Sequence, residues 1–228
     1  MRAVILQPSY IPWRGYFDLI RRADVFVFYD DVQYDKHGWR NRNRVKTPRG
    51  SHWLTIPVRS RGATHGLLIK DAQTNGETEW PRKHFETLRQ LYAPAPYFSD
   101  YLPWLETAYA DPPPLLADYT IATTIELAGM LGITSTKFLR SSTLGIGGRK
   151  TDRLVAILQA LGATEYLSGP SARDYLEPEK FLAAGIDLQY IEYAYPEYPQ
   201  LYPPYDPFVT ILDLLFMTGG DALRYIRG

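Results

Sequence analysis

The sequence predicts an α/β protein built on a mainly parallel β-sheet, with a small antiparallel excursion and a helical insertion. Two observations favour this class. Residues 3–6 and 25–29 are short apolar runs with β-branched members, and residues 16–22 between them carry apolar side chains at helical spacing. Short strands alternate with helices again after residue 132. Two buried strands joined by a short helix are typical of a parallel βαβ unit.

The loop after the first strand starts at Gln7 and is broken by prolines up to Gly15. The helix that follows ends in two arginines, which suit the negative end of a helix dipole. Ligands of open parallel sheets bind at the carboxyl ends of the strands. We therefore expect residues 7–14 and 30–33 to lie on the same rim of the sheet.

The middle of the chain departs from this alternation. Residues 34–51 are rich in Lys, Arg, Asn and Gly, and residues 53–58 and 67–69 are predicted as strands of an antiparallel excursion. Residues 77–132 are predicted to form a helical insertion that prolines interrupt and a glycine ends. Neither repeats nor low-complexity tails divide the chain, so we expect a single domain over residues 1–228.

The last third is predicted to supply the remaining strands. Its expected elements are a strand at 137–139, a glycine-rich loop at 145–148, a helix at 152–161, a strand at 166–167, a helix at 178–184, a strand at 188–193 and an apolar helix at 209–217.

The composition excludes several functional classes. The 228 residues include 25 Lys and Arg against 25 Asp and Glu, a balance that argues against bulk binding of nucleic acid. Zero cysteines exclude disulfides, thiolate metal sites and cysteine nucleophiles. No apolar run reaches the length of a membrane helix, and the first residues turn polar before a signal peptide could form. We expect a cytoplasmic protein without a membrane span.

Two adjacent carboxylates, Asp30 and Asp31, end the second strand. Such a pair can hold a cation, act as a general base, or bind an amine or hydroxyl groups. The plainer interpretation is that they cap the next loop or pair with arginines. No His-rich or Asp-x-Asp spacing accompanies them, so the sequence predicts no dedicated metal site.

A basic segment follows within ten residues. If it is extended, its arginines point to one side and its asparagines to the other. Arginine forks fit phosphate or carboxylate, and asparagine offers donors and acceptors to a sugar or an amide. The alternative is a solvated strand edge blunted by charge. The candidate ligand-binding residues here are Gln33, Arg40, Asn41, Arg42 and Asn43.

The loop from Gln7 to Tyr16 gives the chain a Rossmann-like, nucleotidyltransferase-like βαβ start, because it joins a strand to a helix whose N-terminus could meet a phosphate. Nucleotidylyltransferase-like folds carry a His-x-Gly-His signature in this loop. The matching stretch here is Trp13-Arg14-Gly15-Tyr16, which lacks both histidines. That difference counts against nucleotidyl transfer.

The segment from Ser142 to Arg153 combines hydroxyls, glycines and Lys150 before a helix, and it could wrap an anion. The alternative is an ordinary helix start with Thr151 or Asp152 as N-cap.

Two single residues complete the candidates. Ser168 ends a strand without a Gly-x-Ser-x-Gly elbow, so we interpret it as a binding residue. His84 lies in a predicted helix and is either a proton carrier or a packed structural residue. Together with Asp30 and Asp31 it is a candidate catalytic residue.

Tyrosine and proline, 18 of each, are the unusual feature of the composition. They concentrate in an extended arm at about residues 193–207. One interpretation is an arm laid over the domain, with rings that supply buried area and prolines that restrict the unfolded chain. The other is a wall of the site or a homodimer contact.

Several strings together resemble the WbqC-like family, bacterial proteins often encoded with O-antigen, other surface-polysaccharide or specialised-metabolite genes. The strings are Gln7-Pro-x-Tyr-x-Pro-Trp-x-Gly-Tyr-Phe, Ala23-Asp-Val-Phe-Val-Phe-x-Asp-Asp-Val-Gln33-Tyr, Trp39-x-Asn-Arg-Asn, Trp53-Leu-Thr-x-Pro57-Val, Lys150-Thr-Asp-Arg153 and Tyr166-Leu-Ser-Gly169. The resemblance covers nearly the whole chain. Its matching site residues are Gln7, Asp30, Asp31, Gln33, Asn41, Arg42, Asn43, His84, Lys150, Arg153 and Ser168.

The genetic context of the family implies modification of amino sugars or related amines. We expect a transferase that forms an amide from an activated thioester, bound to coenzyme A or to an acyl or peptidyl carrier protein, on a substrate such as a nucleotide-linked amino sugar. Asp31 or His84 would take the amine proton, while Arg40, Arg42, Lys150 and Arg153 would hold phosphate. No built-in cofactor is expected. The alternatives are an ATP- and magnesium-dependent ligase or nucleotidyl-type enzyme, and a non-catalytic binder of sugar nucleotides.

Overall fold

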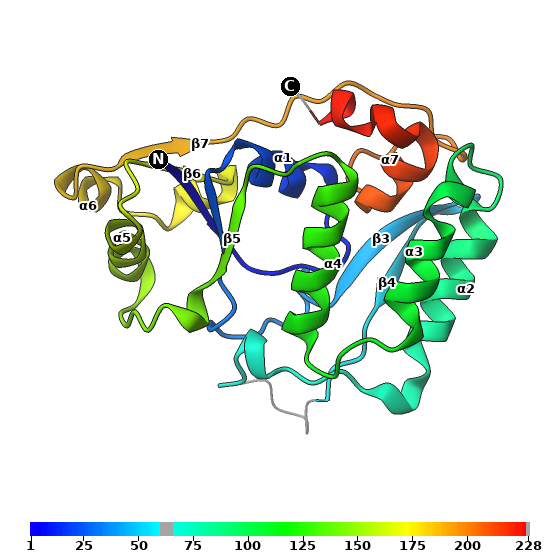
Figure 1. The fold of residues 1–228 in the computed structure, drawn as a ribbon, viewed down its shortest axis with the longest axis horizontal. Coiled ribbons are helices and arrows are strands. Elements are labelled where there is room, and N and C mark those ends of the chain that lie inside the picture. The colour runs from blue at the N-terminus through cyan, green and yellow to red at the C-terminus, as the bar shows by residue number, and fades with distance from the viewer. Residues whose placement is uncertain (60–65, 227–228) are drawn as a thin grey trace.

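A computed structural model describes residues 1–59 and 66–226. Its centre is a five-stranded, fully parallel sheet with strand order β5-β2-β1-β6-β7 (Figure 1). The strands are β1 (Arg2–Leu6), β2 (Val25–Phe28), β5 (Lys137–Arg140), β6 (Glu165–Ser168) and β7 (Asp187–Tyr190). The predicted α/β class with a mainly parallel sheet is confirmed.

The strand order reverses direction between β1 and β6. The chain runs from β1 outward to β2 and β5, then crosses back to β6 and β7 on the other side of β1. The register aligns Leu6 with Phe28, and Phe28 with Arg140, so the carboxyl ends of β1, β2 and β5 are level. A doubly wound sheet opens a crevice at such a reversal, at the carboxyl ends of the strands.

Both faces of the sheet are covered by helices. α1 (Arg14–Arg22) and α4 (Leu116–Met130) pack in one core, and α5 (Lys150–Leu161) and α6 (Pro178–Ala183) pack in the other. Side chains alternate along β1, so that Val4 lies in the first core while Ala3 and Ile5 lie in the second. Burial on both faces explains why these strands are almost continuously apolar in sequence.

A second layer lies beside the sheet, on the right of Figure 1. It contains the antiparallel hairpin of β3 (Arg42–Thr47) and β4 (Gly50–Thr55), and the helices α2 (Trp80–Tyr92), α3 (Phe98–Ala110) and α7 (Ile211–Thr218). The Lys46 backbone N–H donates to the Tyr92 hydroxyl at 3.0 Å and joins the hairpin to α2. The chain also forms short 3-10 segments, η1 (Ile69–Asp71), η2 (Gly76–Thr78), η3 (Ser141–Thr143), η4 (Pro170–Asp174) and η5 (Gly219–Tyr225).

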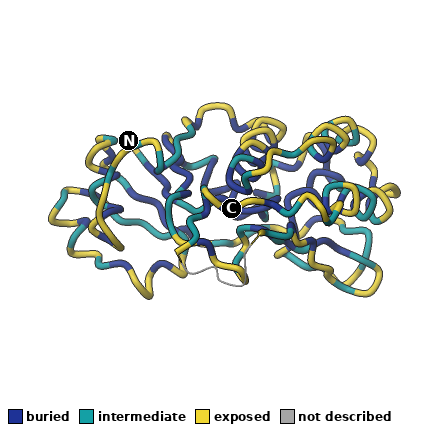
Figure 2. The backbone as a smooth tube through the Cα atoms, turned by 90° about the horizontal axis from the view of Figure 1, so that it is seen from below, coloured by how far each residue is buried: buried dark blue, intermediate teal, exposed yellow. Residues whose placement is uncertain are grey.

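The Tyr- and Pro-rich arm runs from β7 to α7 along the top of Figure 1 without regular structure. Arg14 of α1, only 4% exposed, donates to the carbonyl of Pro196 and stacks on Tyr195 at 4.8 Å. Tyr195 donates in turn to Asp18, also on α1, at 3.0 Å. The arm is therefore laid over the domain, as the first interpretation predicted. Figure 2 shows buried stretches inside both halves of the molecule and exposed ones mainly on the outside.

Three predicted elements differ in the structure. Residues 67–69 do not form a strand, because Leu68 makes only an isolated bridge to Gln33 before η1 begins. The strand expected at 53–58 instead spans Gly50–Thr55, and its pairing with β3 ends before Pro57. β7 ends at Tyr190, since its paired neighbour β6 ends at Ser168.

Within residues 1–59 and 66–226, no helix combines the length and the hydropathy needed to cross a membrane.

Candidate functional site

Two adjoining pockets lie where the strand order reverses. The larger, here called the aromatic pocket, has a volume of about 610 Å³, and the smaller, here called the lysine pocket, about 450 Å³. They share Ile5 and Leu6 at the end of β1, Tyr166 in β6, and Tyr175 after η4. Together they form a crevice at the carboxyl ends of β1 and β6, the position expected for a ligand of a doubly wound sheet.

The aromatic pocket takes its rings from separate parts of the chain. Trp13 precedes α1, Trp39 precedes β3, Tyr193 belongs to the arm, and Phe208 precedes α7. The Trp13 ring meets Tyr193 edge-on at 4.8 Å and Phe208 at 5.7 Å. Trp39 and Phe208 are 43% and 53% exposed, so their ring faces are available to a planar or sugar ligand.

Gly15 explains how Trp13 reaches this position. A Cβ atom at Gly15 would lie 2.3 Å from Cζ2 of Trp13, well inside van der Waals contact. The absence of a side chain therefore lets the indole lie flat across the start of α1. The glycine of the Trp13-Arg14-Gly15-Tyr16 string therefore leaves room for the Trp13 ring in the wall of the aromatic pocket.

The crevice is electropositive. Its cationic lining residues are Arg40, Arg44 and Lys150, and among the described residues that line either pocket there is no Asp or Glu. Arg44 has one carboxylate nearby, Asp206 at 3.7 Å, outside the lining. Positive charge that the lining of a cleft does not balance attracts anionic ligands.

Arg40 and Gln7 connect the two pockets. Arg40 lines the aromatic pocket and donates from Nη1 to Oε1 of Gln7 at 2.5 Å, while Gln7 lines the lysine pocket. The Nε of Arg40 is buried without a hydrogen-bond partner. Burial lowers the pKa of Arg40 from its ordinary value. This guanidinium therefore has hydrogen-bonding capacity left for a ligand.

The start of α5 borders the lysine pocket through Lys150 and Thr151. The helix begins at Lys150, and no side chain caps it, so the alternative with Thr151 or Asp152 as N-cap is wrong. Thr151 accepts instead from the backbone N–H of Glu177 at 3.3 Å. The first backbone N–H groups of α5 thus have no side-chain acceptor and add to the positive potential.

Asp30 has the contacts of a structural anchor. Its side chain is fully buried, and Oδ2 accepts from Nε of Arg140 at 2.7 Å and from Oγ of Ser142 at 2.8 Å. Oδ1 accepts from the Ser142 backbone N–H at 3.0 Å and lies 3.2 Å from Oγ of Ser141. These bonds tie the end of β2 to the end of β5. A catalytic role for Asp30 finds no support in this geometry.

Asp31 is also paired. It accepts from Oγ of Ser141 and from Nη2 of Arg153, each at 2.5 Å. Burial alone raises the pKa of Asp31, but the bonds from Arg153 and Ser141 outweigh it and hold the pKa below its usual range. Arg153 lies behind the lysine pocket, with its guanidinium 5.1 Å from the ring of Tyr29, which lines that pocket. A carboxylate held ionised in this way is a weak base.

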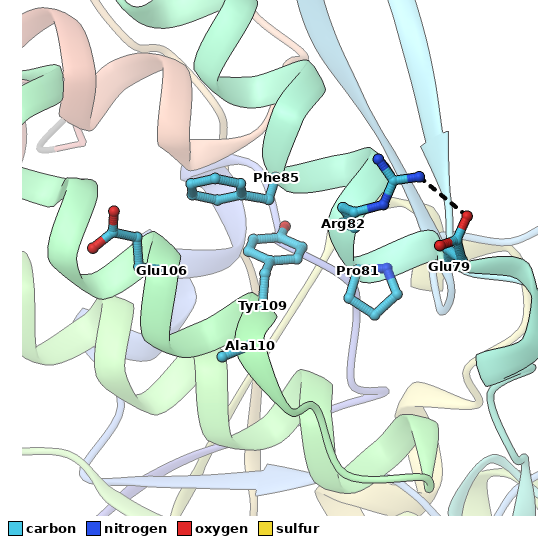
Figure 3. Close-up of a pocket in the computed structure, with 7 residues that line it drawn as sticks. All are labelled: Glu79, Pro81, Arg82, Phe85, Glu106, Tyr109 and Ala110. Atoms are coloured by element: carbon cyan, nitrogen blue, oxygen red, sulfur yellow. Dashed lines mark hydrogen bonds and ion pairs between the residues drawn. The ribbon is translucent and has the colours of Figure 1, made fainter.

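His84 lies in the helical layer and lines neither pocket. Its Nδ1 is 2.9 Å from the hydroxyl of Tyr10, which is 2.6 Å from the hydroxyl of Tyr109. Burial lowers the pKa of His84 to about 4, so the ring is neutral at physiological pH. Tyr109 also borders a shallow depression between α2 and α3, with Phe85 and Glu106 beside it (Figure 3). These contacts favour the structural interpretation of His84.

The residues of the basic segment divide between two pockets. Asn41 donates to the carbonyl of Ile56 at 2.8 Å, and Arg42 stacks on Trp53 at 4.4 Å, so both support β4. They border a separate pocket of about 330 Å³. Asn43 lines the aromatic pocket, and its amide donates to the carbonyls of the loop after β1.

The crevice therefore brings together part of the predicted set. The predicted residues that line it are Gln7, Arg40, Asn43, Lys150 and Ser168. Those that do not are Asp30, Asp31, Gln33, Asn41, Arg42, His84, Ser142 and Arg153. The lining residues missing from the predicted set include Trp13, Arg44, Tyr166, Tyr175, Tyr193 and Phe208. The arm supplies one of them, Tyr193, so it is both a cover and a wall.

No cluster of three or more His, Cys, Asp or Glu side chains that could hold a metal ion occurs in the part of the chain that the structure describes.

The fold and the crevice define a doubly wound α/β protein with an electropositive crevice lined by aromatic rings at its topological switch point. The chain belongs to the WbqC-like protein family, whose model matches residues 7–225. It is 39% identical over 233 residues to the uncharacterized protein Rv1507c of Mycobacterium tuberculosis, an alignment that covers 99% of this chain and 97% of that protein. No solved structure matches the chain significantly.

Proposed function

We propose that this protein is a transferase that forms an amide bond. It would move an acyl or aminoacyl group from a thioester donor to an amine-bearing substrate such as a nucleotide-linked amino sugar, in surface-polysaccharide or specialised-metabolite biosynthesis. The observation that carries the proposal is the crevice itself, where Arg40, Arg44 and Lys150 face a lining without carboxylates and beside exposed aromatic rings.

A nucleotide-linked sugar combines the two features that this crevice complements. Its phosphates carry charge for Arg40 and Arg44, and arginine forks bind phosphate oxygens bidentately. Its base and sugar rings present flat faces for Trp39 and Trp13. A volume of about 610 Å³ lies within the range of small-molecule sites.

The chemistry needs no covalent enzyme intermediate and no resident cofactor. The amine nitrogen attacks the thioester carbonyl, the C–N bond forms, the C–S bond breaks, and the amine proton ends on the departing thiolate. Among the described residues that line the crevice there is no Cys, His, Asp or Glu. The protein would therefore act by binding both substrates in a reactive orientation, which can supply several kcal/mol of the barrier.

Two measurements test the proposal. Calorimetric titration should show that uridine diphosphate binds and that uridine binds far more weakly, because the phosphates carry the interaction with the arginines. Incubation of UDP-linked amino sugars with acyl-coenzyme A or acyl-carrier donors should then give an amide, detected by mass spectrometry. Failure of uridine diphosphate to bind, or a folded preparation that forms no amide from any donor, would count against the transferase.

One observation also favours a non-catalytic binder of sugar nucleotides. The three predicted catalytic residues, Asp30, Asp31 and His84, are engaged in internal contacts and do not line the crevice. The binder predicts saturable affinity for the sugar nucleotide with the ligand recovered unchanged. Release of pyrophosphate from ATP in the same assay would instead support the ligase alternative.

A further inference from the structure

We propose that the lysine pocket is the acyl-donor site, and that Gln7 donates from its side-chain amide to the donor's carbonyl oxygen. The inference rests on the transferase proposed above and gives its second substrate a place. The donor would lie on the α5 side of β1 while the amine-bearing substrate occupies the aromatic pocket.

The lysine pocket has the lining of an acyl slot. Its walls combine aliphatic side chains with three tyrosines, and a cation and a hydroxyl lie at one end. The aliphatic lining residues are Ile5, Leu6, Val32, Leu154 and Leu176, and the polar ones at the start of α5 are Lys150 and Thr151. Lys150 is exposed and makes no ion pair among the described residues. A short acyl chain fits the apolar part, and Lys150 fits an anionic group of the donor.

The orientation of the Gln7 amide follows from its neighbour. Arginine has only donors, so the amide oxygen of Gln7 must face Arg40, as the 2.5 Å bond to Oε1 shows. The amide nitrogen is then directed elsewhere, and it makes no hydrogen bond with any described residue of the chain. Donation from a cation to Oε1 also polarises the amide and strengthens Nε2 as a donor.

Gln7 stands where the two pockets meet. It directly follows Leu6, a lining residue of both, and its partner Arg40 lines the aromatic pocket. During attack by the amine, negative charge develops on the donor's carbonyl oxygen. A fixed N–H at that oxygen stabilises the tetrahedral intermediate, after which the C–S bond breaks and the thiolate takes the amine proton.

The slot is tested first by binding, with butyryl-coenzyme A as the probe. We expect calorimetry to show that butyryl-coenzyme A binds equally well with and without saturating uridine diphosphate. Two variants should each lower the affinity for butyryl-coenzyme A tenfold or more and leave the affinity for uridine diphosphate unchanged. They are Val32→Phe, which narrows the lysine pocket, and Lys150→Ala, on the surface. Absence of probe binding, competition with uridine diphosphate, or unchanged affinity in both folded variants would overturn the assignment.

The role of Gln7 is tested by Gln7→Glu, which keeps an oxygen toward Arg40 and removes the N–H. We expect kcat for amide formation to fall about 100- to 1000-fold, with KM for the amine substrate within threefold. If Gln7 were only structural, the variant would instead have a raised KM and a lower affinity for uridine diphosphate, both by the same factor. That result would overturn the proposed role of Gln7. If the wild type forms no amide at all, the transferase fails while the binding test still decides the slot.

Discussion

Two polar clusters lie at the carboxyl ends of the neighbouring strands β2 and β1, and they differ in how their charges are paired. After β2, Asp30 and Asp31 are bound by Arg140, Arg153 and two serines. At the end of β1, Gln7 and its partner Arg40, which precedes β3, face a crevice without a carboxylate in its described lining. Charges that are paired internally stabilise the fold, and charges left without counter-ions are available to a ligand.

The difference arises from the strand order. β5 adds beside β2 and brings Arg140 level with Phe28, so its guanidinium and the turn of η3 enclose Asp30. No strand covers the loop after β1 in that way, because the order reverses there and β6 starts the other half of the sheet. A position at a strand end thus predicts a ligand only where the neighbouring strand end leaves it open.

The largest effect on stability is expected for Asp30→Ala. The change removes a fully buried carboxylate and leaves Nε of Arg140 and the hydroxyl of Ser142 without their acceptor, and breaking a buried ion pair costs about 3–5 kcal/mol. The free energy of unfolding, measured with denaturant, should fall by that amount.

The matched control is Asp118→Ala. Asp118 binds the same Arg140 at 2.5 Å but is 39% exposed, and exposed pairs contribute at most about 1 kcal/mol. Equal losses in the two variants, or a loss of uridine diphosphate affinity in folded Asp30→Ala, would contradict the structural role of this cluster.

Another buried carboxylate can be compared with Asp30, because its hydrogen-bond partners do not include an arginine. Asp213 of α7 is fully buried and accepts from Tyr92, Tyr198 and Gln200 at 2.8–2.9 Å. Burial raises the pKa of Asp213 to about 6, although these bonds and the charge of Lys46 oppose the shift. The native state therefore binds the proton more tightly than the unfolded chain does.

Stability from that proton is complete below pH 4 and is lost as the pH rises to about 6. A shift of about two pKa units corresponds to about 3 kcal/mol. We expect denaturant unfolding between pH 4 and pH 7 to show that the wild type loses about 3 kcal/mol of unfolding free energy relative to Asp213→Asn as the pH rises. Above about pH 6 the difference between the two proteins should stay constant. A difference independent of pH would refute the raised pKa.

Much of the fold could be predicted from the sequence because a parallel sheet buries both faces of its strands. The runs at residues 3–6 and 25–29 are apolar at consecutive positions, and prolines and glycines bound them. The segment at 67–69 was also predicted as a strand, but it is too short to pair beyond one bridge at Leu68. Local pattern identifies an element and does not say whether a partner strand exists.

The site could be predicted only in part, for the same reason. Gln7 and Lys150 were found because loops after a strand, or before a helix, face ligands in this fold class, and Arg40 was found because it belongs to the basic segment with alternating arginines. The ion pair that makes Asp30 unavailable to a ligand depends on Arg140, 110 positions later in the chain. The Phe208 ring of the aromatic pocket likewise comes from the last part of the chain. Neither contact has a local sequence signal.

A third prediction concerns affinity, and it compares two arginines of the basic segment. Arg40→Ala should weaken uridine diphosphate about 10- to 100-fold, since a charge-assisted hydrogen bond contributes about 1.5–3 kcal/mol. Arg42→Ala should change this affinity less than twofold, because Arg42 stacks on Trp53 and borders a different pocket. Calorimetric titration of both variants with uridine diphosphate checks this prediction. Equal losses of affinity in the two variants would mean that the crevice is not the nucleotide site.

The smallest effect is expected for a change at Gly15. This change tests the contribution of the aromatic rings to ligand binding separately from that of the arginines. In Gly15→Ala the new Cβ would displace the Trp13 ring, which it would otherwise meet at 2.3 Å. Since a ring contact contributes about 0.5–1.5 kcal/mol, uridine diphosphate should bind about 2- to 10-fold more weakly, with a shift in tryptophan fluorescence. Helix propensity favours alanine here and offsets part of the packing that the displaced ring loses, so the free energy of unfolding should change by about 1 kcal/mol at most. Gly147→Ala is the control, because nothing lies within 4 Å of its Cβ position and it should behave as wild type. An unchanged affinity in Gly15→Ala despite a fluorescence shift would show that the arginines alone hold the ligand and that the aromatic wall does not contact it.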